Sequence, residues 1–205
     1  KNIKQIALAK GEIMNNINEN GSIVLNADDK FYRLFNRIAL KKKIKVYSFS
    51  MKKKNANIRL NYVKKEKSKF KMSIYFGNKK KYFFISSNFE NNIKNLLAAI
   101  TVISIFKDIK TLNKNIFYNF NILEGRGDIS KIKIKKKNIF LIDESYNSNP
   151  LSLNSAIKNF DLIKGAKSKK HLILGDMLEL GKHSKKLHYE LSTVVNASSI
   201  DKVYV

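Results

Sequence analysis

The strongest constraint on the fold is a pattern that occurs twice in the second half of the chain, an apolar run that ends in polar residues. Residues 138–142 are mostly apolar and lead into a polar run, 143–149, which ends at Pro150, the only proline. A second apolar run, 171–174, is followed by a glycine and then by Asp176. This order indicates an open α/β sheet, in which ligands bind beyond the carboxyl ends of the strands. We therefore predict the α/β class and a site in the polar residues after each strand.

The bulk composition limits the class of protein. A length of 205 residues allows one domain or two small ones, and 43% hydrophobic residues are enough for a buried core. The chain has no cysteine, which excludes disulfides and thiolate metal sites. It has no apolar run of about 18 residues, so we predict no membrane insertion. It begins at Lys1 without an initiator methionine or a signal core, and we interpret it as a piece of a longer chain.

The formal net charge of +25 leaves two classes of protein open. One is a basic α/β module that binds nucleic acid through its phosphates. The other is a protein that carries lysine on every solvated surface. Arginine is the usual reader of bases and phosphates, but it is scarce here, whereas lysine occurs in all segments of the chain. The sequence therefore favours the second class, without a nucleic-acid partner.

The first 50 residues are predicted to alternate between helix and strand. Apolar spacing over residues 3–18 predicts a helix with an inward face of Ile6, Ala9, Ile13 and Ile17. Asp28 and Asp29 are predicted to cap a helix over residues 30–39. Strands are predicted on either side of that helix, over 23–25 and 44–49.

The composition of the chain changes in its middle part. Three runs that mix lysine with β-branched and aromatic residues predict an antiparallel meander, polar on one face, over 57–63, 69–76 and 81–86. A helix is predicted over residues 91–107, with an apolar stripe of Ile93, Leu96, Leu97, Ile100, Ile103 and Phe106.

A domain boundary is predicted near residue 127, where two glycines flank Arg126. A strand pair, over 129–135 and 138–142, is predicted after it. Pro150 is predicted to open a helix that runs to about residue 163, because the first helical position has no use for an amide hydrogen. The remaining predictions are a helix over 184–197 and a strand over 202–205.

Two motifs carry a resemblance to a known family. The run Asp143-Glu-Ser-Tyr-Asn-Ser-Asn-Pro150, with Leu174-Gly-Asp-Met-Leu-Glu-Leu-Gly181 some 25 residues later, resembles the Mur ligase family. Further segments agree in order with that family, namely Ala9–Ile13, Gly21–Asp28, Asn92–Ala99 and Gly125–Arg126. The resemblance covers nearly the whole chain.

The resemblance implies a fold and an activity. Residues 1–127 would be the second half of a central ATPase domain, and residues 128–205 the first part of a Rossmann-like C-terminal domain. The implied reaction joins a carboxylate to an amine with ATP and magnesium, through an acyl phosphate. The second motif is similar to that of members that add D-alanyl-D-alanine to UDP-N-acetylmuramoyl-tripeptide, as monomers in the bacterial cytoplasm. The phosphate-binding Gly-Lys-Thr/Ser loop of the family is not in this sequence, so we expect the piece alone to be inactive. Another ATP-dependent carboxylate–amine ligase of the same superfamily stays open.

The resemblance also implies roles for particular residues. Lys10 would be carbamylated, would help to hold magnesium, and would be catalytic together with Arg126, which would contact the nucleotide phosphates. The other nucleotide contacts would be Asn92 and Asn95 near the adenine and Asp143 at the ribose. Substrate would be contacted by Tyr146, Asn147, Asn149 and Asp176. From composition alone, a helix cap is an equally good interpretation of Asn149, and we interpret His188 as a packed or capping histidine rather than a ligand.

Overall fold

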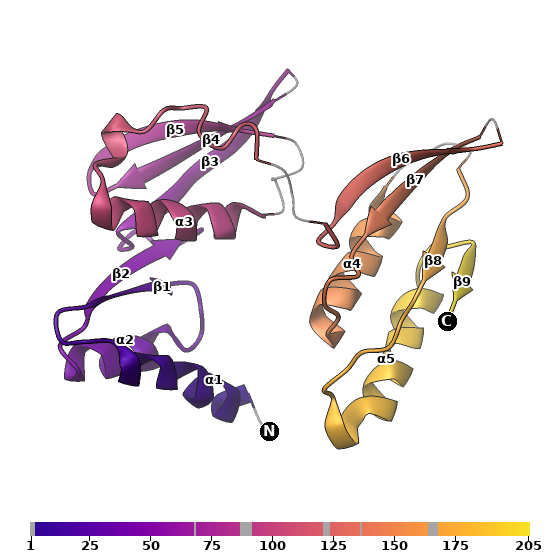
Figure 1. Cartoon of the computed structure of the whole chain (residues 1–205), viewed down its shortest axis with the longest axis horizontal. Coiled ribbons are helices and arrows are strands. Elements are labelled where there is room, and N and C mark those ends of the chain that lie inside the picture. The colour runs from indigo at the N-terminus through magenta and orange to yellow at the C-terminus, as the bar shows by residue number, and fades with distance from the viewer. Residues whose placement is uncertain (1–2, 68, 87–91, 121–123, 136, 164–167) are drawn as a thin grey trace. The chain divides into compact units, whose positions relative to one another are not determined.

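The computed structural model describes residues 3–67, 69–86, 92–120, 124–135, 137–163 and 168–205 (Figure 1). By compactness the chain divides into two units, Lys1–Asn121 and Ile122–Val205. The domain boundary predicted near residue 127 lies a few residues after the boundary between these two units. As a statement about the domains of the longer protein, it stays a prediction. Each unit is described by itself.

The first unit is built on one mixed sheet. Its elements are α1 (Ile3–Gly11), a 3-10 helix (Glu12–Asn16), β1 (Ser22–Asn26), α2 (Tyr32–Lys41), β2 (Lys45–Ser50), β3 (Ile58–Glu66), β4 (Lys69–Phe76), β5 (Lys79–Ile85), α3 (Ile93–Phe106) and a 3-10 helix (Ile109–Thr111). The strands lie in the order β1-β2-β3-β4-β5. The β1–β2 and β2–β3 pairs are parallel, and the β3–β4 and β4–β5 pairs are antiparallel. The predicted meander is confirmed.

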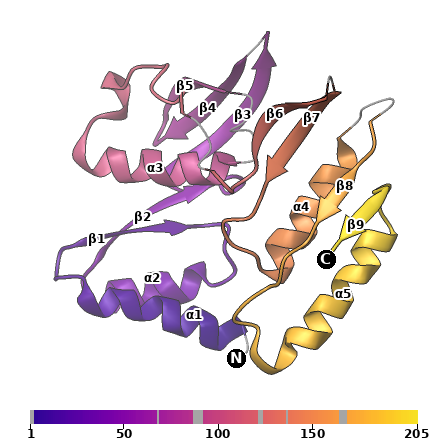
Figure 2. The ribbon, with the colours of Figure 1, turned by 45° about the vertical axis from the view of Figure 1, so that its right-hand side comes forward.

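Both faces of this sheet are covered by helices, with α3 on one face and α1 and α2 on the other (Figures 1 and 2). The α3 side holds the larger core, in which Leu97 and Ile100 are fully buried against meander residues such as Phe83. The other side holds a smaller core around Met14 and Ala39. Burying a side chain of this size contributes about 1.5–3 kcal/mol. The α3 core is therefore the main source of stability in the unit.

The inward face predicted for residues 3–18 is wrong at Ile6, Ala9 and Ile13, which are exposed, whereas Ile17 is partly buried against the smaller core as predicted. The buried residues are Ala7, Gly11 and Met14, whereas Ile6 and Ile13 are 45% and 64% exposed. The spacing of the buried residues is also helical, but the set consists mainly of small side chains. A Cβ at Gly11 would lie 3.5 Å from the Phe35 ring of α2, an ordinary van der Waals distance, so the two helices pack closely here. The predicted inward position of Phe106 is also wrong, since that side chain is 84% exposed at the last residue of α3.

The predicted capping role of the Asp28-Asp29 pair is wrong as well. The helix α2 begins without a side-chain cap, and Asp29 instead accepts a hydrogen bond from Phe31 N at 2.7 Å. Asp28 accepts hydrogen bonds from Ser50 Oγ and Met51 N, both at 2.6 Å. Asp28 therefore ties the carboxyl end of β1 to that of β2.

The second unit has two small sheets and two long helices. Its elements are β6 (Asp128–Ile134), β7 (Lys137–Asp143), α4 (Pro150–Leu162), β8 (His171–Ile173), a 3-10 helix (Gly181–His183), α5 (Ser184–Asn196) and β9 (Lys202–Tyr204). The β6–β7 pair is antiparallel and the β8–β9 pair is parallel. The core joins α4, α5 and the segment after β8 through Ile157, Leu191 and Met177. The predicted helix start at Pro150 is confirmed.

Candidate functional site

The segment before β6 is fastened to the loop after β7 by backbone hydrogen bonds. Gly127 N donates to Asp143 O at 2.7 Å, and Tyr146 N donates to Gly125 O at 3.0 Å. Gly125 N also donates to the side chain of Asp128 at 2.8 Å. We call residues 125–128 and 143–146 the paired loops. Arg126, predicted for the site from one part of the sequence, thus comes together with Asp143 and Tyr146, predicted from another.

The paired loops require glycine at two positions. Gly125 and Gly127 have φ angles of +73° and +88°, a region that other residues adopt only at a cost. A Cβ at Gly125 would also lie 2.8 Å from Tyr146 N, and one at Gly127 would lie 3.0 Å from Glu144 Oε1. The glycines therefore allow the two segments to approach, and they fix the backbone on both sides of Arg126.

Arg126 stacks on the ring of Tyr146. The guanidinium carbon lies 4.1 Å from the ring centroid, and both residues are exposed. Within the described part of the chain, Arg126 forms no ion pair with a carboxylate. An exposed guanidinium can bind an anion in a bidentate manner. The arrangement is suited to a phosphate group.

Two neighbouring carboxylates in the paired loops differ in their acidity. Hydrogen bonds from the side chain and then the backbone of Ser145 lower the pKa of Asp143 below its ordinary value of 3.8. Burial, followed by repulsion from Asp128 and Asp143, raises the pKa of Glu144 above its ordinary value of 4.5. Asp143 is therefore the stable anion of the two, and a carboxylate is a good acceptor for sugar hydroxyls.

Asn149 is the N-cap of α4. Its Oδ1 accepts hydrogen bonds from Leu151 N at 3.1 Å and Ser152 N at 3.0 Å, while Ser152 Oγ accepts one from Asn149 N at 3.1 Å. The interpretation of Asn149 as a helix cap is confirmed, and its role in substrate binding stays a prediction. Asn147, predicted for the same role, is exposed two residues earlier.

Asp176 lies shortly after β8, at the end of the second apolar run of the sequence. Its side chain is 87% exposed, and Oδ1 lies 3.6 Å from Nε2 of His188 on α5. The next residue, Met177, is buried in the core of the unit. The structure therefore holds the backbone beside Asp176 in place while leaving the carboxylate open to solvent.

In the first unit two of the three predicted residues are in contact. Asn95 Nδ2 donates to Asn92 Oδ1 at 3.2 Å at the start of α3. Lys10 is exposed near the end of α1, and among the described residues no hydrogen bond joins it to either asparagine. Nor do the described residues contain a cluster of three His, Asp or Glu side chains that could hold a metal ion.

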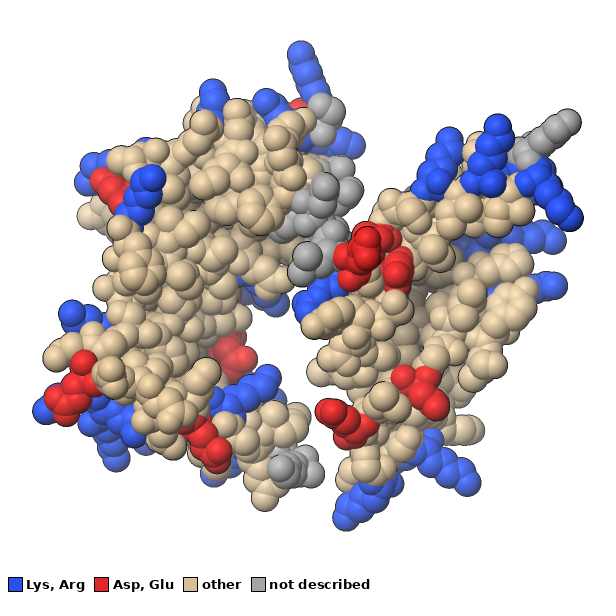
Figure 3. Space-filling model, viewed as in Figure 1, with Lys and Arg blue, Asp and Glu red and all other residues tan. Residues whose placement is uncertain are grey.

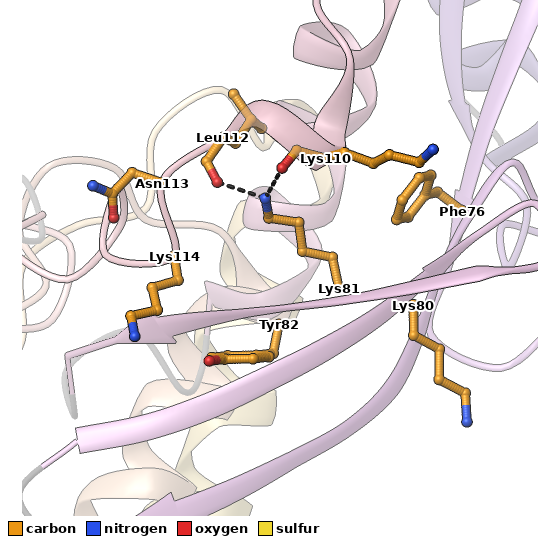
Figure 4. Close-up of a pocket in the computed structure, with 8 residues that line it drawn as sticks. All are labelled: Phe76, Lys80, Lys81, Tyr82, Lys110, Leu112, Asn113 and Lys114. Atoms are coloured by element: carbon orange, nitrogen blue, oxygen red, sulfur yellow. Dashed lines mark hydrogen bonds between the residues drawn. The ribbon is translucent and has the colours of Figure 1, made fainter.

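A hollow of 560 Å3 in the first unit lies away from these residues (Figure 4). It is lined by Phe76, Lys80, Lys81, Tyr82, Lys110, Leu112, Asn113 and Lys114. The Lys81 ammonium donates to the carbonyl oxygens of Lys110 and Leu112, both at 2.5 Å. These bonds join the segment after α3 to β5, which carries Lys81. None of the predicted site residues lines the hollow, and its central cation already has a structural partner.

Basic side chains are spread over both units on the face shown in Figure 3, rather than gathered into one patch. This distribution agrees with the interpretation of lysine as a general surface residue. The interpretation of His188 as a packed histidine is confirmed by its hydrogen bonds to Met177 and Ser184, but the sequence did not predict these partners or the raised pKa of Glu144. The signal for Glu144 was its place directly beside Asp143 at a strand end, whereas the contacts of His188 depend on tertiary structure.

Comparison with known proteins identifies the family. The family described as Mur ligase middle domain matches residues 1–103, and that described as Mur ligase, glutamate ligase domain, matches residues 130–205. The chain belongs to the Mur ligase family. The family resemblance and the α/β fold class expected from the sequence are confirmed.

Named members of the Mur ligase family align over the whole chain. The UDP-N-acetylmuramoyl-tripeptide–D-alanyl-D-alanine ligase of Rickettsia prowazekii is 30% identical over 99% of this chain and 44% of its own length. That of Buchnera aphidicola subsp. Baizongia pistaciae is 30% identical over 100% of this chain and 42% of its own length. The chain thus spans less than half the length of these relatives.

The fold has solved counterparts in the Mur ligase family. The MurF ligase of Thermotoga maritima in complex with ADP superposes with a TM-score of 0.74 over 98% of this chain and 44% of its own, at 22% identity. Among the helices of the described residues, none combines the length and the apolar character that crossing a bilayer requires.

Proposed function

We propose that this chain is part of an ATP-dependent ligase that joins D-alanyl-D-alanine to UDP-N-acetylmuramoyl-tripeptide in the cytoplasmic synthesis of peptidoglycan precursors. The observation that carries the proposal is the stacking of Arg126 on Tyr146 beside Asp143. It gathers an exposed cation, an aromatic ring and an ionised carboxylate, which can contact the phosphates, base and sugar of a nucleotide. The names of the two relatives and the ADP in the Thermotoga maritima structure support the choice of reaction.

The proposed reaction has two steps. A carboxylate oxygen of the tripeptide attacks the γ-phosphorus of ATP, the bond to the β-phosphate oxygen breaks, and ADP leaves. The amine nitrogen of the dipeptide then attacks the acyl carbon, phosphate leaves with the bonding electrons, and the amine loses a proton. Both steps gain from positioning and from cations placed where negative charge develops.

The residues of the chain take distinct roles toward ATP in this proposal. Arg126 binds the phosphates through its exposed guanidinium. Asp143 accepts hydrogen bonds from the ribose hydroxyls. Asn92 and Asn95 contact the adenine, because an amide offers a donor and an acceptor to a purine edge. Their mutual hydrogen bond fixes the direction of both amides.

Magnesium would neutralise phosphate charge when bound, and carbamylated Lys10 would supply one oxygen ligand. The exposed position of Lys10 leaves its amine free for carbamylation. The described residues contain no cluster of three carboxylate or histidine ligands.

Toward the dipeptide, the proposal assigns Asp176 to orient the incoming amine, since its exposed carboxylate attracts an ammonium group. In this proposal Tyr146, Asn147 and Asn149, in the segment that leads from β7 into α4, contact substrate. A ligase of the same superfamily that adds a single amino acid is the alternative. Supplying the full-length protein with D-alanyl-D-alanine and with single amino acids, and measuring ATP-dependent product by mass spectrometry, separates the two.

The nucleotide assignments are tested by Arg126→Ala and Asp143→Ala in the full-length protein. We expect Arg126→Ala to lower kcat/KM for ATP about 10- to 100-fold, the loss typical of a charged hydrogen bond. Asp143→Ala should cause a smaller loss, in KM for ATP. Arg37→Ala, on the exposed side of α2, is the matched control and should leave the kinetics unchanged. Unchanged ATP kinetics in both site variants would refute the assignment.

A further inference from the structure

The ring of His188 has a hydrogen-bond partner on each nitrogen. Nε2 lies 3.1 Å from Met177 N, and Nδ1 lies 2.9 Å from the carbonyl oxygen of Ser184. A backbone N–H can only donate and a carbonyl oxygen can only accept. Nε2 must therefore be the acceptor and Nδ1 must carry the proton. The two contacts specify one neutral tautomer of His188.

The contact with Met177 acts on Asp176. The amide hydrogen that His188 accepts belongs to the peptide group that links Asp176 to Met177, so the bond sets the plane of that group. The Met177 side chain is 3% exposed and packs with Ile157 and Leu191. The residue after Asp176 is thus held at its amide by the ring and at its side chain by the core.

The tautomer also leaves the Asp176 carboxylate free. Its Oδ1 is 3.6 Å from Nε2, too far for a hydrogen bond, and Nε2 in this state has no hydrogen to offer it. The carboxylate, at 87% exposure, has no other described ion-pair partner. A cation from outside the chain can therefore take that place.

We propose that His188 is a positioning residue for Asp176. It holds the Asp176–Met177 peptide group through Nε2 and thereby directs the carboxylate toward the amine of the incoming dipeptide. This inference rests on the proposed ligase function and on the role of Asp176 in it. His188 itself touches no substrate, so its effect should fall on use of the dipeptide and not on use of ATP.

Three substitutions in the full-length protein separate the two ring contacts. His188→Gln keeps a polar atom at the place of Nε2, His188→Asn keeps one at the place of Nδ1, and His188→Leu keeps neither. We expect His188→Leu and His188→Asn to raise KM for D-alanyl-D-alanine about three- to tenfold, as loss of one neutral hydrogen bond predicts. His188→Gln should stay within about twofold of wild type, and KM for ATP should not change in any variant.

His183 offers the matched control, because it is an exposed histidine before α5 whose side chain makes no capping bond. His183→Leu should leave both KM values unchanged. The inference is overturned if His188→Leu keeps a normal dipeptide KM, or if His188→Asn matches wild type and His188→Gln does not. Equal losses for ATP and dipeptide in all three variants would also overturn it, since they indicate a purely structural role.

Failure of the proposed function gives a different result, namely a wild-type protein that uses ATP but forms no product with D-alanyl-D-alanine. A readout independent of activity covers that case and any variant that does not fold. The 15N chemical shifts of the His188 ring in the wild-type protein should show a protonated Nδ1 and an unprotonated Nε2. The opposite tautomer would overturn the inference.

Discussion

The two units of the chain are stabilised in different ways. The first has a large core, in which α3 and the meander bury residues such as Phe83 and Leu97 completely. In the second, the buried hydrophobic residues of the described part are Ile157, Met177 and Leu191, while Phe140 on β7 is 66% exposed. Similar helix and strand patterns in the sequence thus lead to different amounts of burial, because burial depends on what covers each face.

Relative to the hydrophobic core, polar contacts contribute more to the packing of the second unit than to that of the first. The Asp161 carboxylate at the end of α4 accepts hydrogen bonds from Ser199 N at 2.8 Å and Ser199 Oγ at 2.6 Å. Lys170 N, just before β8, donates to Asp201 at 2.7 Å. The cap at Asn149 and the contacts of His188 belong to the same group. The comparison predicts that core substitutions have the largest effects in the first unit and that polar contacts have more weight, relative to the core, in the second.

The largest expected effect is that of Phe83→Ala in the first unit. Removing a fully buried phenylalanine should lower the free energy of unfolding by about 3–5 kcal/mol. The control is Phe140→Ala, which removes an exposed phenylalanine and should change stability by less than about 0.5 kcal/mol. Denaturant unfolding followed by circular dichroism measures both. Equal effects of the two substitutions would contradict the contrast in burial.

A smaller effect is expected from Asp28→Ala, which removes the tie between β1 and β2. We expect a loss of about 1–3 kcal/mol, because Ser50 Oγ and Met51 N lose a charged acceptor. The measurement is again denaturant unfolding. A loss as large as that of Phe83→Ala would contradict the dominance of the core in this unit.

The lowered pKa of Asp28 predicts that the stability of the first unit depends on pH. Burial alone would raise the pKa of Asp28, but hydrogen bonds from Ser50 and Met51 and the charges of Lys53 and Lys52 outweigh it and hold the pKa below its ordinary value of 3.8. A lowered pKa gives stability that is present above pH 3.8 and is lost as the pH falls through the lower folded value. Asp28→Asn should therefore flatten the acid side of the stability profile of the first unit.

The smallest of these effects is that of Asn149→Ala in the second unit. Loss of the N-cap of α4 should cost about 1 kcal/mol, and Asn149→Asp should restore most of it. Asn147→Ala, an exposed asparagine without a cap contact, is the control and should be neutral. If Asn149→Ala is also neutral, polar contacts do not have the weight in this unit that the comparison gives them.

Local sequence pattern was sufficient for the order of the elements and for the helix start at Pro150. It also placed Arg126, Asp143 and Tyr146 in one site, through the family motifs. It failed for most of the inward face of α1, because the large apolar residues Ile6 and Ile13 are exposed and the packing uses Ala7 and Gly11. It failed for Asp28 because the partners of that carboxylate are on another strand.

The parallel pairing of β8 with β9 has a consequence for how the second unit forms during synthesis. The β6–β7 hairpin closes over neighbouring residues, and hairpins form within about 1–10 μs. The pair His171–Lys202 joins positions about thirty residues apart, with α5 between them. At roughly 5–20 residues per second, the ribosome needs about 2–6 s to deliver that partner. Until then β8 lacks its partner strand β9, and Met177 lacks its core neighbour Leu191 of α5, so the segment that carries Asp176 is fixed only after α5 has emerged.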